Sequence, residues 1–222
     1  YRYNFNERYA FRLQGLYGNV EAWDRESKNP LDQLRNLGFR SVIFEASALL
    51  EINFFKYRGL AKDSRTWTPF VFGGLAYWHF NPQNLLDDTW YDLQPLGTEG
   101  QNTGGGSGYS LNQICIPFGA GFKFALTKRV DIDLEWGLRR TYTDYLDDVG
   151  GTYADNAALL EQAGPLTALL ADPSALRTTG LNTGRARGDS QTKDWYQYTG
   201  ITISLLLTKF TECDPIWQKK RH

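Results

Sequence analysis

The chain has 222 residues, which suits a single β-barrel or β-sandwich domain, and its net charge of −1 gives no electrostatic reason to expect a nucleic-acid partner. No segment approaches the roughly 20 apolar residues that a transmembrane helix needs. The mean hydropathy of −0.47 still allows a membrane β-barrel, because such a strand presents an apolar side chain to lipid only at every second residue.

The first 56 residues predict a short strand, a turn and two long strands. Residues 1–5 form the end of one strand, a turn follows at Asn6-Glu7, and a second strand runs from about Tyr9 to Trp23. Residues 24–37 are polar and predict a loop. The strand at 38–56 alternates between an apolar face (Val42, Phe44, Ala46, Ala48, Leu50, Ile52, Phe54) and a polar face (Ser41, Glu45, Ser47, Glu51, Asn53). Because Tyr1 begins in mid-pattern without a visible signal peptide, we expect that a leader was cleaved or the chain was trimmed.

The next strand is predicted at residues 67–80, but its two faces are ambiguous. Phe70, Phe72, Ala76 and Trp78 compete with Val71, Leu75 and Tyr77 for the outward face. We favour the first set outward, which turns His79 inward. Residues 57–66 predict a short connection, and residues 81–108 predict a long loop that ends in the glycine-rich run NTGGGSG.

The clearest hairpin lies in residues 109–145. Ile114, Ile116, Phe118, Ala120, Phe122 and Phe124 share one face, and after a break at Thr127-Lys128 the face continues with Val130, Ile132, Leu134, Trp136 and Leu138. The opposite face carries charges in mid-strand. Strict alternation over this length is typical of a lipid-facing barrel strand with a polar interior.

The rest of the chain predicts a long interruption, a last strand and a tail. Residues 144–193 form the interruption, and 156–163 and 165–171 within it have helix-forming composition. The last strand runs from about Trp195 to Lys209, with Ile201, Ile203, Leu205 and Leu207 on one face. We therefore divide the chain into a barrel at residues 1–210 and a C-terminal tail at 211–222.

Short and long connections alternate strictly along the chain. Short turns lie near residue 6, at 57–66 and at 127, and long loops lie at 24–37, 81–108 and 144–193. Outer-membrane barrels have short periplasmic turns and long extracellular loops, so we expect an outer-membrane protein with a periplasmic C-terminus. Aromatic residues suggest a periplasmic rim (Phe54, Trp67, Phe124) and an outer rim (Trp23, Trp78, Tyr109, Tyr142, Trp195).

These elements predict an all-β fold, an eight-stranded antiparallel up-and-down transmembrane β-barrel with short helices in its last long loop. Six full strands and the stub at residues 1–5 are visible. Closing an antiparallel barrel requires an even number, so we expect the first strand to precede Tyr1. The alternative is a soluble, lipocalin-like barrel with its apolar face inside; the long strands and mid-strand charges favour the membrane form.

Eight charged side chains are predicted to point into the interior: Arg12, Glu45, Glu51, Lys123, Asp131, Asp133, Glu135 and Arg139. Across the 127 turn, Lys123 should lie near Asp131 or Asp133. Since buried charges persist only when they are paired, we expect a neutralised network that fills the interior. The alternative is an ion or proton path.

Other candidate chemistry is weaker. An outer-rim enzyme would need a base such as His79, with Asp144 or Asp147 nearby, but a histidine in the aromatic rim is the simpler interpretation. Two loop clusters, Asp87, Asp88 and Asp92, and Asp144, Asp147 and Asp148, could share calcium; solvated loop ends are simpler, because the spacing matches no calcium loop. We expect no catalytic residues, no cofactor, no metal and no disulfide between Cys115 and Cys213.

The tail contains a possible docking segment for a periplasmic partner. Its residues are Cys213, Trp217, Lys219, Lys220 and Arg221. Tryptophan is a common anchor of protein interfaces, so Trp217 would provide the apolar contact. The alternative is a disordered tail.

Several strings resemble a known family. They are RYNFNERYAFR, LGFRSVIFEASALLEINFF, TPFVFGGLAYWHFNP, WYDLQPLGTEGQ, YSLNQICIPFGAGFKFAL, EWGLRRTYTDYLDDVGGTY and DWYQYTGITISL. Together they resemble the PorG-like family of small outer-membrane barrels in bacteria that use type IX secretion. The resemblance covers nearly the whole chain, and LQPLGTEGQ followed by TDYLDDVGGTY is its most specific part. Family members usually carry one more N-terminal arm before RYNFN, in agreement with the strand count.

The resemblance implies a non-enzymatic component of the type IX protein secretion machinery. Its partners would be outer-membrane lipid and the periplasmic ring of the PorK lipoprotein and PorN, which it would tether to the membrane. The family also contains barrels with no assigned role. A barrel that binds or transports a ligand through its large outer loops therefore remains the alternative.

Overall fold

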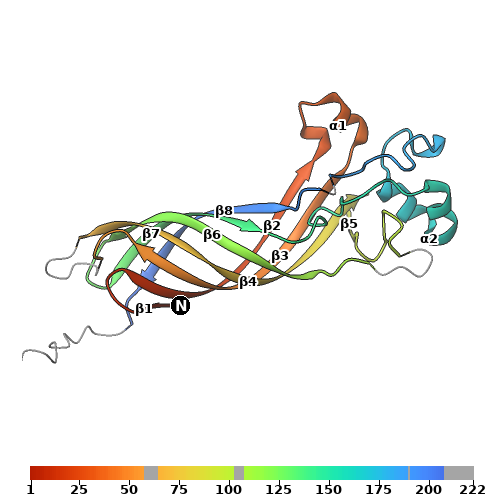
Figure 1. Ribbon diagram of the computed structural model, residues 1–222. Coiled ribbons are helices and arrows are strands. Elements are labelled where there is room, and N and C mark those ends of the chain that lie inside the picture. Colours follow the sequence, from red (N-terminus) through yellow and green to blue (C-terminus); the bar gives the residue numbers. More distant parts are fainter. Residues whose placement is uncertain (58–64, 103–107, 190, 208–222) are drawn as a thin grey trace, which may run out of the picture.

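The protein is mainly β, and one antiparallel sheet contains all the strands of its described residues. The computed structural model describes residues 1–57, 65–102, 108–189 and 191–207. Eight strands curl into a half-barrel, bonded in the order β1-β2-β3-β4-β6-β7-β8 with β5 paired to β4 (Figure 1). The strands on the main path are β1 (Arg2–Asn4), β2 (Tyr9–Trp23), β3 (Gly38–Asn53), β4 (Trp67–Leu86), β6 (Asn112–Ala125), β7 (Val130–Arg140) and β8 (Trp195–Leu205).

The six predicted long strands and the N-terminal stub are confirmed, together with two of the short turns. At the first turn, the Asn6 side-chain oxygen accepts hydrogen bonds from the backbone N–H groups of Arg8 and Tyr9. At the second turn, the Thr127 hydroxyl does the same for Arg129 and Val130. Asparagine and threonine therefore fix these turns by bonding the backbone two and three residues ahead.

The predicted faces of β3, β6 and β7 are also confirmed. On β3, Glu45 and Glu51 are buried on the concave side of the sheet, while Phe44 and Leu50 are exposed on the convex side. The same alternation continues through the hairpin of β6 and β7. Because successive side chains of a strand point to opposite faces, the face of one residue determines the faces of all the others in that strand.

The favoured orientation of β4 is wrong. Phe70, Phe72 and Trp78 are 1%, 5% and 0% exposed and point to the concave side, whereas Leu75 and Tyr77 are 63% and 60% exposed on the convex side. Trp78 therefore does not belong to the outer aromatic rim. Tyr109 is likewise withdrawn from that rim, because its hydroxyl donates a hydrogen bond to Asp148.

Two glycines on the neighbouring strand explain this orientation. Gly121 and Gly119 of β6 pair with Phe70 and Phe72. A Cβ at Gly121 would lie 2.6 Å from the Phe70 ring, and one at Gly119 would lie 2.6 Å from the Phe72 ring. The inward rings therefore need glycine opposite them, and glycine within a strand often marks such a close approach.

Three predicted loops contain regular structure. The loop at 24–37 holds a 3₁₀ turn (Asp24–Glu26) and helix α1 (Pro30–Arg35), whose first turn is capped by Asn29. Residues 81–86 continue β4, and β5 (Thr89–Asp92) folds back on it, so the long loop predicted at 81–108 is shorter. The predicted helices at 156–171 are confirmed as α2 (Asn156–Ala171), kinked at Gly164. A second 3₁₀ turn follows at Arg177–Thr179.

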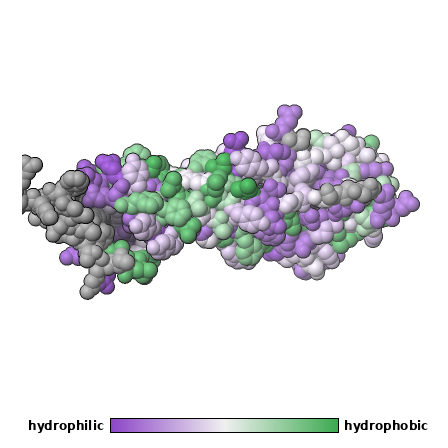
Figure 2. All heavy atoms as spheres, turned by 60° about the horizontal axis from the view of Figure 1, so that its bottom comes forward, coloured by the Kyte–Doolittle hydropathy of each residue, from purple (hydrophilic) through white to green (hydrophobic). Residues whose placement is uncertain are grey.

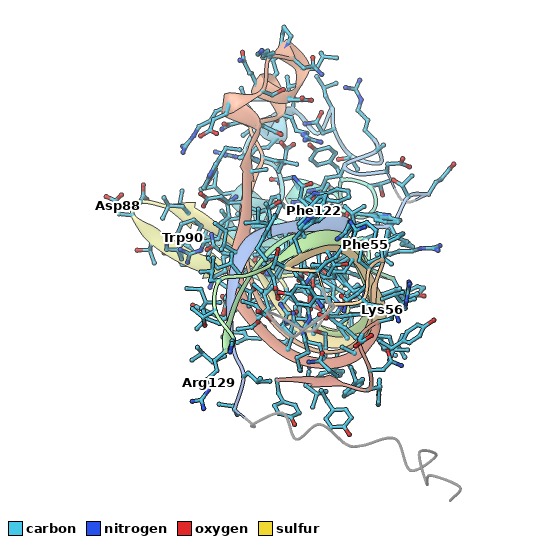
Figure 3. All side chains as sticks on the ribbon, turned by 90° about the vertical axis from the view of Figure 1, so that its left-hand side faces the viewer. Phe55, Lys56, Asp88, Trp90, Phe122 and Arg129 are labelled. Carbon is cyan, nitrogen blue, oxygen red and sulfur yellow. The ribbon has the colours of Figure 1, made fainter. Side chains whose placement is uncertain are left out.

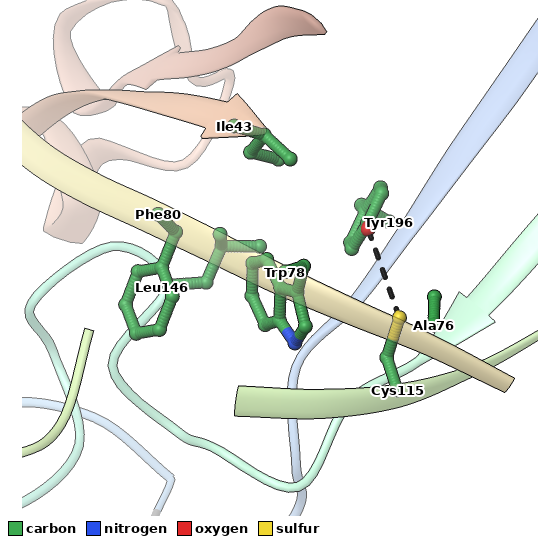
Figure 4. Packing of buried hydrophobic residues seen from close by; sticks show 7 residues of the cluster. All are labelled: Ile43, Ala76, Trp78, Phe80, Cys115, Leu146 and Tyr196. Carbon is green, nitrogen blue, oxygen red and sulfur yellow. Dashed lines mark hydrogen bonds between the residues drawn. The ribbon is translucent and has the colours of Figure 1, made fainter. Parts of the chain in front are cut away.

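The buried apolar side chains lie mainly on the concave side, toward the loop end. Ile43, Trp78, Phe80, Cys115 and Tyr196 pack there with Ala76 and with Leu146 from the loop after β7 (Figure 4). Trp78 and Phe80 stack with ring centroids 4.6 Å apart. We call this set the aromatic zone. It closes the concave side near the loops. Nearer the turns, polar side chains share the concave side with Leu49, Phe70 and Phe72.

Candidate functional site: a paired charge network on the concave side

Glu51 is the centre of the charged part of the concave side. It is 1% exposed. Its carboxylate oxygens lie 2.6 Å from Lys123 Nζ, 2.9 Å from Arg2 Nε and 3.1 Å from Arg12 Nε. Because β1, β2, β3 and β6 supply these four residues, the cluster joins strands that are not neighbours in the sheet. We call it, with Asp133 and Glu135, the charged zone.

The two carboxylates of β7 complete this zone. Arg2 Nη2 donates to Asp133 Oδ2 at 2.5 Å, and Arg12 binds Glu135 through both Nη atoms, at 2.5 and 3.0 Å. Arg2 Nη1 also donates to Ser204 Oγ on β8 at 3.1 Å. Two-pronged binding to a carboxylate is the strongest common form of ion pair. These contacts connect the first strands of the sheet to the last ones.

A second, smaller ion pair lies toward the aromatic zone. Arg139 Nε is 3.2 Å from Glu45 Oε2, and the Tyr196 hydroxyl donates to the same oxygen at 2.7 Å. The Cys115 sulfur lies 3.9 Å from that hydroxyl. Arg139 is 0% exposed, so its partner stabilises a charge that water does not reach.

Aromatic rings lie beside two of the cations of the charged zone. Lys123 Nζ lies 4.5 Å from the Phe70 ring centroid, and the Arg12 guanidinium carbon lies 5.1 Å from that of Phe72. The faces of aromatic rings attract cations. The inward orientation of β4 therefore contributes to the charge network as well as to the apolar packing.

Cations and carboxylates balance in the described network. Arg2, Arg12, Lys123 and Arg139 are the cations, and Glu45, Glu51, Asp133 and Glu135 the carboxylates. Not every polar atom of the network has a hydrogen-bond partner. Partners are lacking for Glu45 Oε1, Asp133 Oδ1 and both Nη atoms of Arg139. A buried ion pair adds little net stability over apolar packing of the same volume, but removing one partner leaves a buried charge uncompensated. The arrangement is suited to filling and aligning the concave side.

The structure brings most of the predicted interior residues together, with two differences in detail. Lys123 pairs with Asp133 in the β6–β7 register, as expected, but its ammonium binds Glu51 across the concave side. Asp131 lies at the turn end, beside Tyr57, and is only partly buried. Arg2 was not predicted, although its position opposite Arg12 in the β1–β2 register shows that both point the same way.

The loops form a second buried charge cluster at the opposite end. Asp148 accepts hydrogen bonds from Thr98 Oγ1 at 2.5 Å and from the Tyr109 hydroxyl at 2.7 Å. Arg187 Nη1 lies 3.7 Å from Asp148 and 3.3 Å from Glu99. Burial raises the pKa of Asp148, and Arg187 opposes that shift. This cluster ties the loops after β5 and β7 together.

The six loop aspartates do not form one cation site. Asp87 and Asp88 make the tight β4–β5 turn with positive φ values of 47° and 60°, and Asp92 accepts from the amides of Asn81 and Gln83. Asp144 lies 4.0 Å from Lys193. Across residues 1–57, 65–102, 108–189 and 191–207, no three metal-ligating side chains come together.

His79 does not point inward, as the favoured orientation of β4 required. It lies on the convex side, where its Nδ1 is 3.1 Å from Asn112 Oδ1. The predicted docking residues Cys213, Trp217, Lys219, Lys220 and Arg221 lie outside the described residues, as does most of the turn at 57–66.

Comparisons with known proteins give one match. Residues 1–164 match the family model described as a domain of unknown function, DUF6089. No curated protein and no solved structure matches the chain. Among the helices that the structure describes, none is long and apolar enough to cross a membrane. Because the matched segment extends from β1 through β7 into α2, the chain belongs to the DUF6089 family.

Proposed function

We propose that this protein is an outer-membrane β-barrel that serves as a non-enzymatic component of type IX protein secretion. In this role it anchors the periplasmic ring of PorK and PorN to the outer membrane. The observation that carries the membrane part is the distribution of side chains across the sheet. The secretion part rests on the resemblance of the whole chain to the PorG-like barrels.

The convex side of the sheet is largely apolar, and the mid-strand charges lie on the concave side. Leu50, Tyr77 and Ile201 are 59%, 60% and 72% exposed on the convex side, whereas Glu51 and Lys123 are buried on the concave side. Figure 2 shows hydrophobic residues over the middle of the molecule, with more hydrophilic residues toward both ends. A large exposed apolar band supports contact with lipid. A soluble lipocalin-like barrel would have the reverse arrangement.

The strand lengths support the same placement. β3 has 16 residues and β6 has 14, while β7 and β8 have 11 each. A tilted strand needs about 9–11 residues to cross the hydrocarbon layer. Every strand on the main path except the stub β1 is therefore long enough.

The finer fold that we propose is a closed eight-stranded barrel. A gap of about 600 Å³ separates β1 from β8, and Arg2 and Ser204 are among its lining residues. No strand pairing joins these two edges in the described chain. A strand that precedes Tyr1 would pair with both edges and give an even number in the wall. β5 is not part of the wall, since it pairs only with β4.

The filled interior supports an anchor rather than a pore. The aromatic zone and the charged zone occupy the concave side, and eight strands leave room for little more than side chains. In the proposed orientation the turns near residues 6 and 127 face the periplasm, together with the tail at 211–222. Trp217 and the basic residues after it would then be available to the ring.

One experiment tests membrane location and ring binding as separate readouts. We expect the full-length protein to fractionate with the outer membrane and to copurify with PorK and PorN, and deletion of residues 211–222 to lower the yield of bound ring without moving the barrel. Recovery from the soluble fraction would contradict the membrane part. An unchanged yield of ring would contradict docking by the tail.

A second candidate is ligand capture by the outer loops. It is favoured by the buried Asp148–Arg187 cluster, which gives the loop end a packed structure of its own together with α2. Deletion of residues 150–190 should then abolish function while the barrel still assembles. If secretion and ring binding survive that deletion, the anchor interpretation alone is sufficient.

A further inference from the structure

The end of the half-barrel opposite the loops contains a basic cavity. It has a volume of about 550 Å³ and lies between the β1–β2 turn, the end of β3 and the β6–β7 turn. Figure 3 looks at the molecule from this end, with Lys56 and Arg129 on different sides of the opening. We call this cavity the mouth. It is continuous with the charged zone through Arg2 and Lys123, which line both.

Cations exceed carboxylates around the mouth. Its basic lining residues are Arg2, Arg8, Lys56, Lys123, Lys128 and Arg129, and its acidic ones are Glu7 and Asp131. Arg2 and Lys123 are already neutralised by the charged zone. Lys56, Lys128 and Arg129 are exposed, and none of the three has an ion pair within the described chain. A concave site lined mainly by positive charges raises the local concentration of negatively charged ligands. This holds although the net charge of the whole chain is −1.

The side-chain oxygen of Asn53, a buried hydrogen-bond acceptor among the residues that line the mouth, favours a ligand that has hydrogen-bond donors. Asn53 is 4% exposed, and its side-chain oxygen has no hydrogen-bond partner, whereas its amide nitrogen donates to the Glu7 carbonyl oxygen. A phosphate ester offers only acceptor oxygens at neutral pH and leaves such an atom unsatisfied. A peptide offers backbone N–H donors for the acceptor and, through glutamate or aspartate, carboxylates for the cations.

We propose that the mouth binds an acidic peptide segment of a periplasmic partner. The inference rests on the proposed function, because only that orientation places the mouth in the periplasm. Lys56, Lys128 and Arg129 bind the carboxylates of the peptide, and Asn53 accepts a backbone N–H. The tail at 211–222 carries three strongly basic residues, Lys219, Lys220 and Arg221, against two acidic ones, Glu212 and Asp214, so an acidic segment of a partner matches the charge of the mouth better.

The test measures peptide binding by the full-length protein in uncharged detergent micelles. The probe is a short labelled peptide in which glutamate alternates with serine, and glutamine replaces glutamate in the reference peptide. We expect fluorescence anisotropy to report binding of the acidic peptide only, weakening as salt is added. The double variant Lys128→Gln/Arg129→Gln should weaken binding by roughly threefold to tenfold, because exposed ion pairs are individually weak.

The matched control is Lys28→Gln/Arg185→Gln, which removes the same two charges from exposed positions in the loops. It should bind the peptide as the unaltered protein does. Equal loss in both double variants, or equal binding of the glutamine peptide, would overturn the proposal. Binding of glycerol phosphate through Lys128 and Arg129 without binding of the peptide would also overturn it, in favour of a lipid head group.

The failure of this proposal is distinguishable from failure of the proposed function. Outer-membrane fractionation and ring copurification test the function without reference to Lys128 or Arg129. If both succeed and the acidic peptide does not bind, the mouth proposal alone is wrong. If the peptide binds and the protein is not in the outer membrane, the site stands but its periplasmic partner does not.

Discussion

Two zones fill the concave side of the half-barrel in different ways. Near the turns, Arg2, Arg12 and Lys123 converge on Glu51. Near the loops, Trp78 and Phe80 stack under Leu146. The aromatic zone gains free energy by removing apolar surface from water. The charged zone pays a desolvation penalty that its ion pairs offset, so it contributes mainly alignment.

The position of each zone agrees with this difference. The charged zone lies where the two sheet edges, β1 and β8, face each other without strand pairing. There Arg2 reaches Ser204 on the opposite edge strand, β8, and Asp133 on its neighbour, β7. Charge-assisted hydrogen bonds add geometric specificity, so they fix which groups meet across the gap. The aromatic zone also reaches from β2 to β8, through Leu16, Val20 and Tyr196, but by apolar contact.

The largest expected effect comes from breaking the centre of the charged zone. Glu51→Ala leaves three buried or partly buried cations without their common partner. We expect a loss of about 5 kcal/mol in the free energy of unfolding, as for other broken buried pairs. Urea unfolding in micelles, followed by tryptophan fluorescence, measures it.

The control for this prediction is Glu21→Ala on β2. Glu21 is exposed, so its removal should change the free energy of unfolding by less than about 0.5 kcal/mol. If both substitutions cost the same, the charged zone has no special role in holding the strands.

Removing the central ring of the aromatic zone should cost somewhat less. Trp78→Ala leaves a cavity beside Phe80 and Tyr196, and we expect a loss of about 4 kcal/mol. Trp195→Ala, at a ring that is 49% exposed, is the matched substitution and should cost about 1 kcal/mol. Similar losses for the two tryptophans would argue against a packed aromatic zone.

A smaller effect tests the contact between β4 and β6 that lies under the charged zone. Gly121→Val places side-chain atoms against the Phe70 ring and the backbone of β7, and we expect a loss of about 1–3 kcal/mol from overpacking. The second substitution Phe70→Ala should recover part of that loss. A double variant no better than the sum of the single ones would show that the ring is not the obstacle.

The last prediction concerns the loop end, where a carboxyl group has no ion pair in the described chain. Burial and the neighbouring Asp194 raise the pKa of Asp147 to about 7. The folded loops therefore bind the proton more tightly than the unfolded chain, whose aspartate pKa is about 3.9. The stabilising contribution is complete below that value and is lost as the pH rises through about 7.

Hydrogen exchange of amides 144–149, corrected for the intrinsic rate, should thus show weaker protection at pH 8 than at pH 5. Asp147→Asn should remove this difference, because the amide stays neutral at both values. Asp92→Asn, at a carboxylate that accepts bonds from Asn81 and Gln83, is the comparison and should leave the difference in place. A pH difference that persists in Asp147→Asn would contradict the assignment.

The outward and inward faces of most long strands could be predicted from the alternation of apolar and polar residues, because a period of two is a local property of the backbone. On β3, Glu45 and Leu50 are an odd number of residues apart, and this alone assigns them to opposite faces. The interior network followed partly from the same pattern, since the mid-strand charges alternate with the apolar residues and therefore share the opposite face. Arg2 was missed because a three-residue strand gives no periodicity to recognise.

The orientation of β4 shows where local pattern fails. Both of its faces are rich in apolar residues, so hydropathy does not distinguish them. Its inward side is fixed by Gly119 and Gly121 on β6, which leave space for the rings of Phe70 and Phe72. The ion-pair partner of Lys123 could not be predicted from local pattern either, because Glu51 comes within reach of its ammonium group only when the sheet curls.

The sequence by itself determined the six long strands, two of the short turns and the polar and apolar faces of β3, β6 and β7, because alternation and turn bonding are local. The tertiary structure decided which face of β4 turns inward and which cation binds which carboxylate. It also decided that three exposed cations surround one mouth. These features depend on the curvature of the sheet, which brings together residues from strands that are distant in sequence.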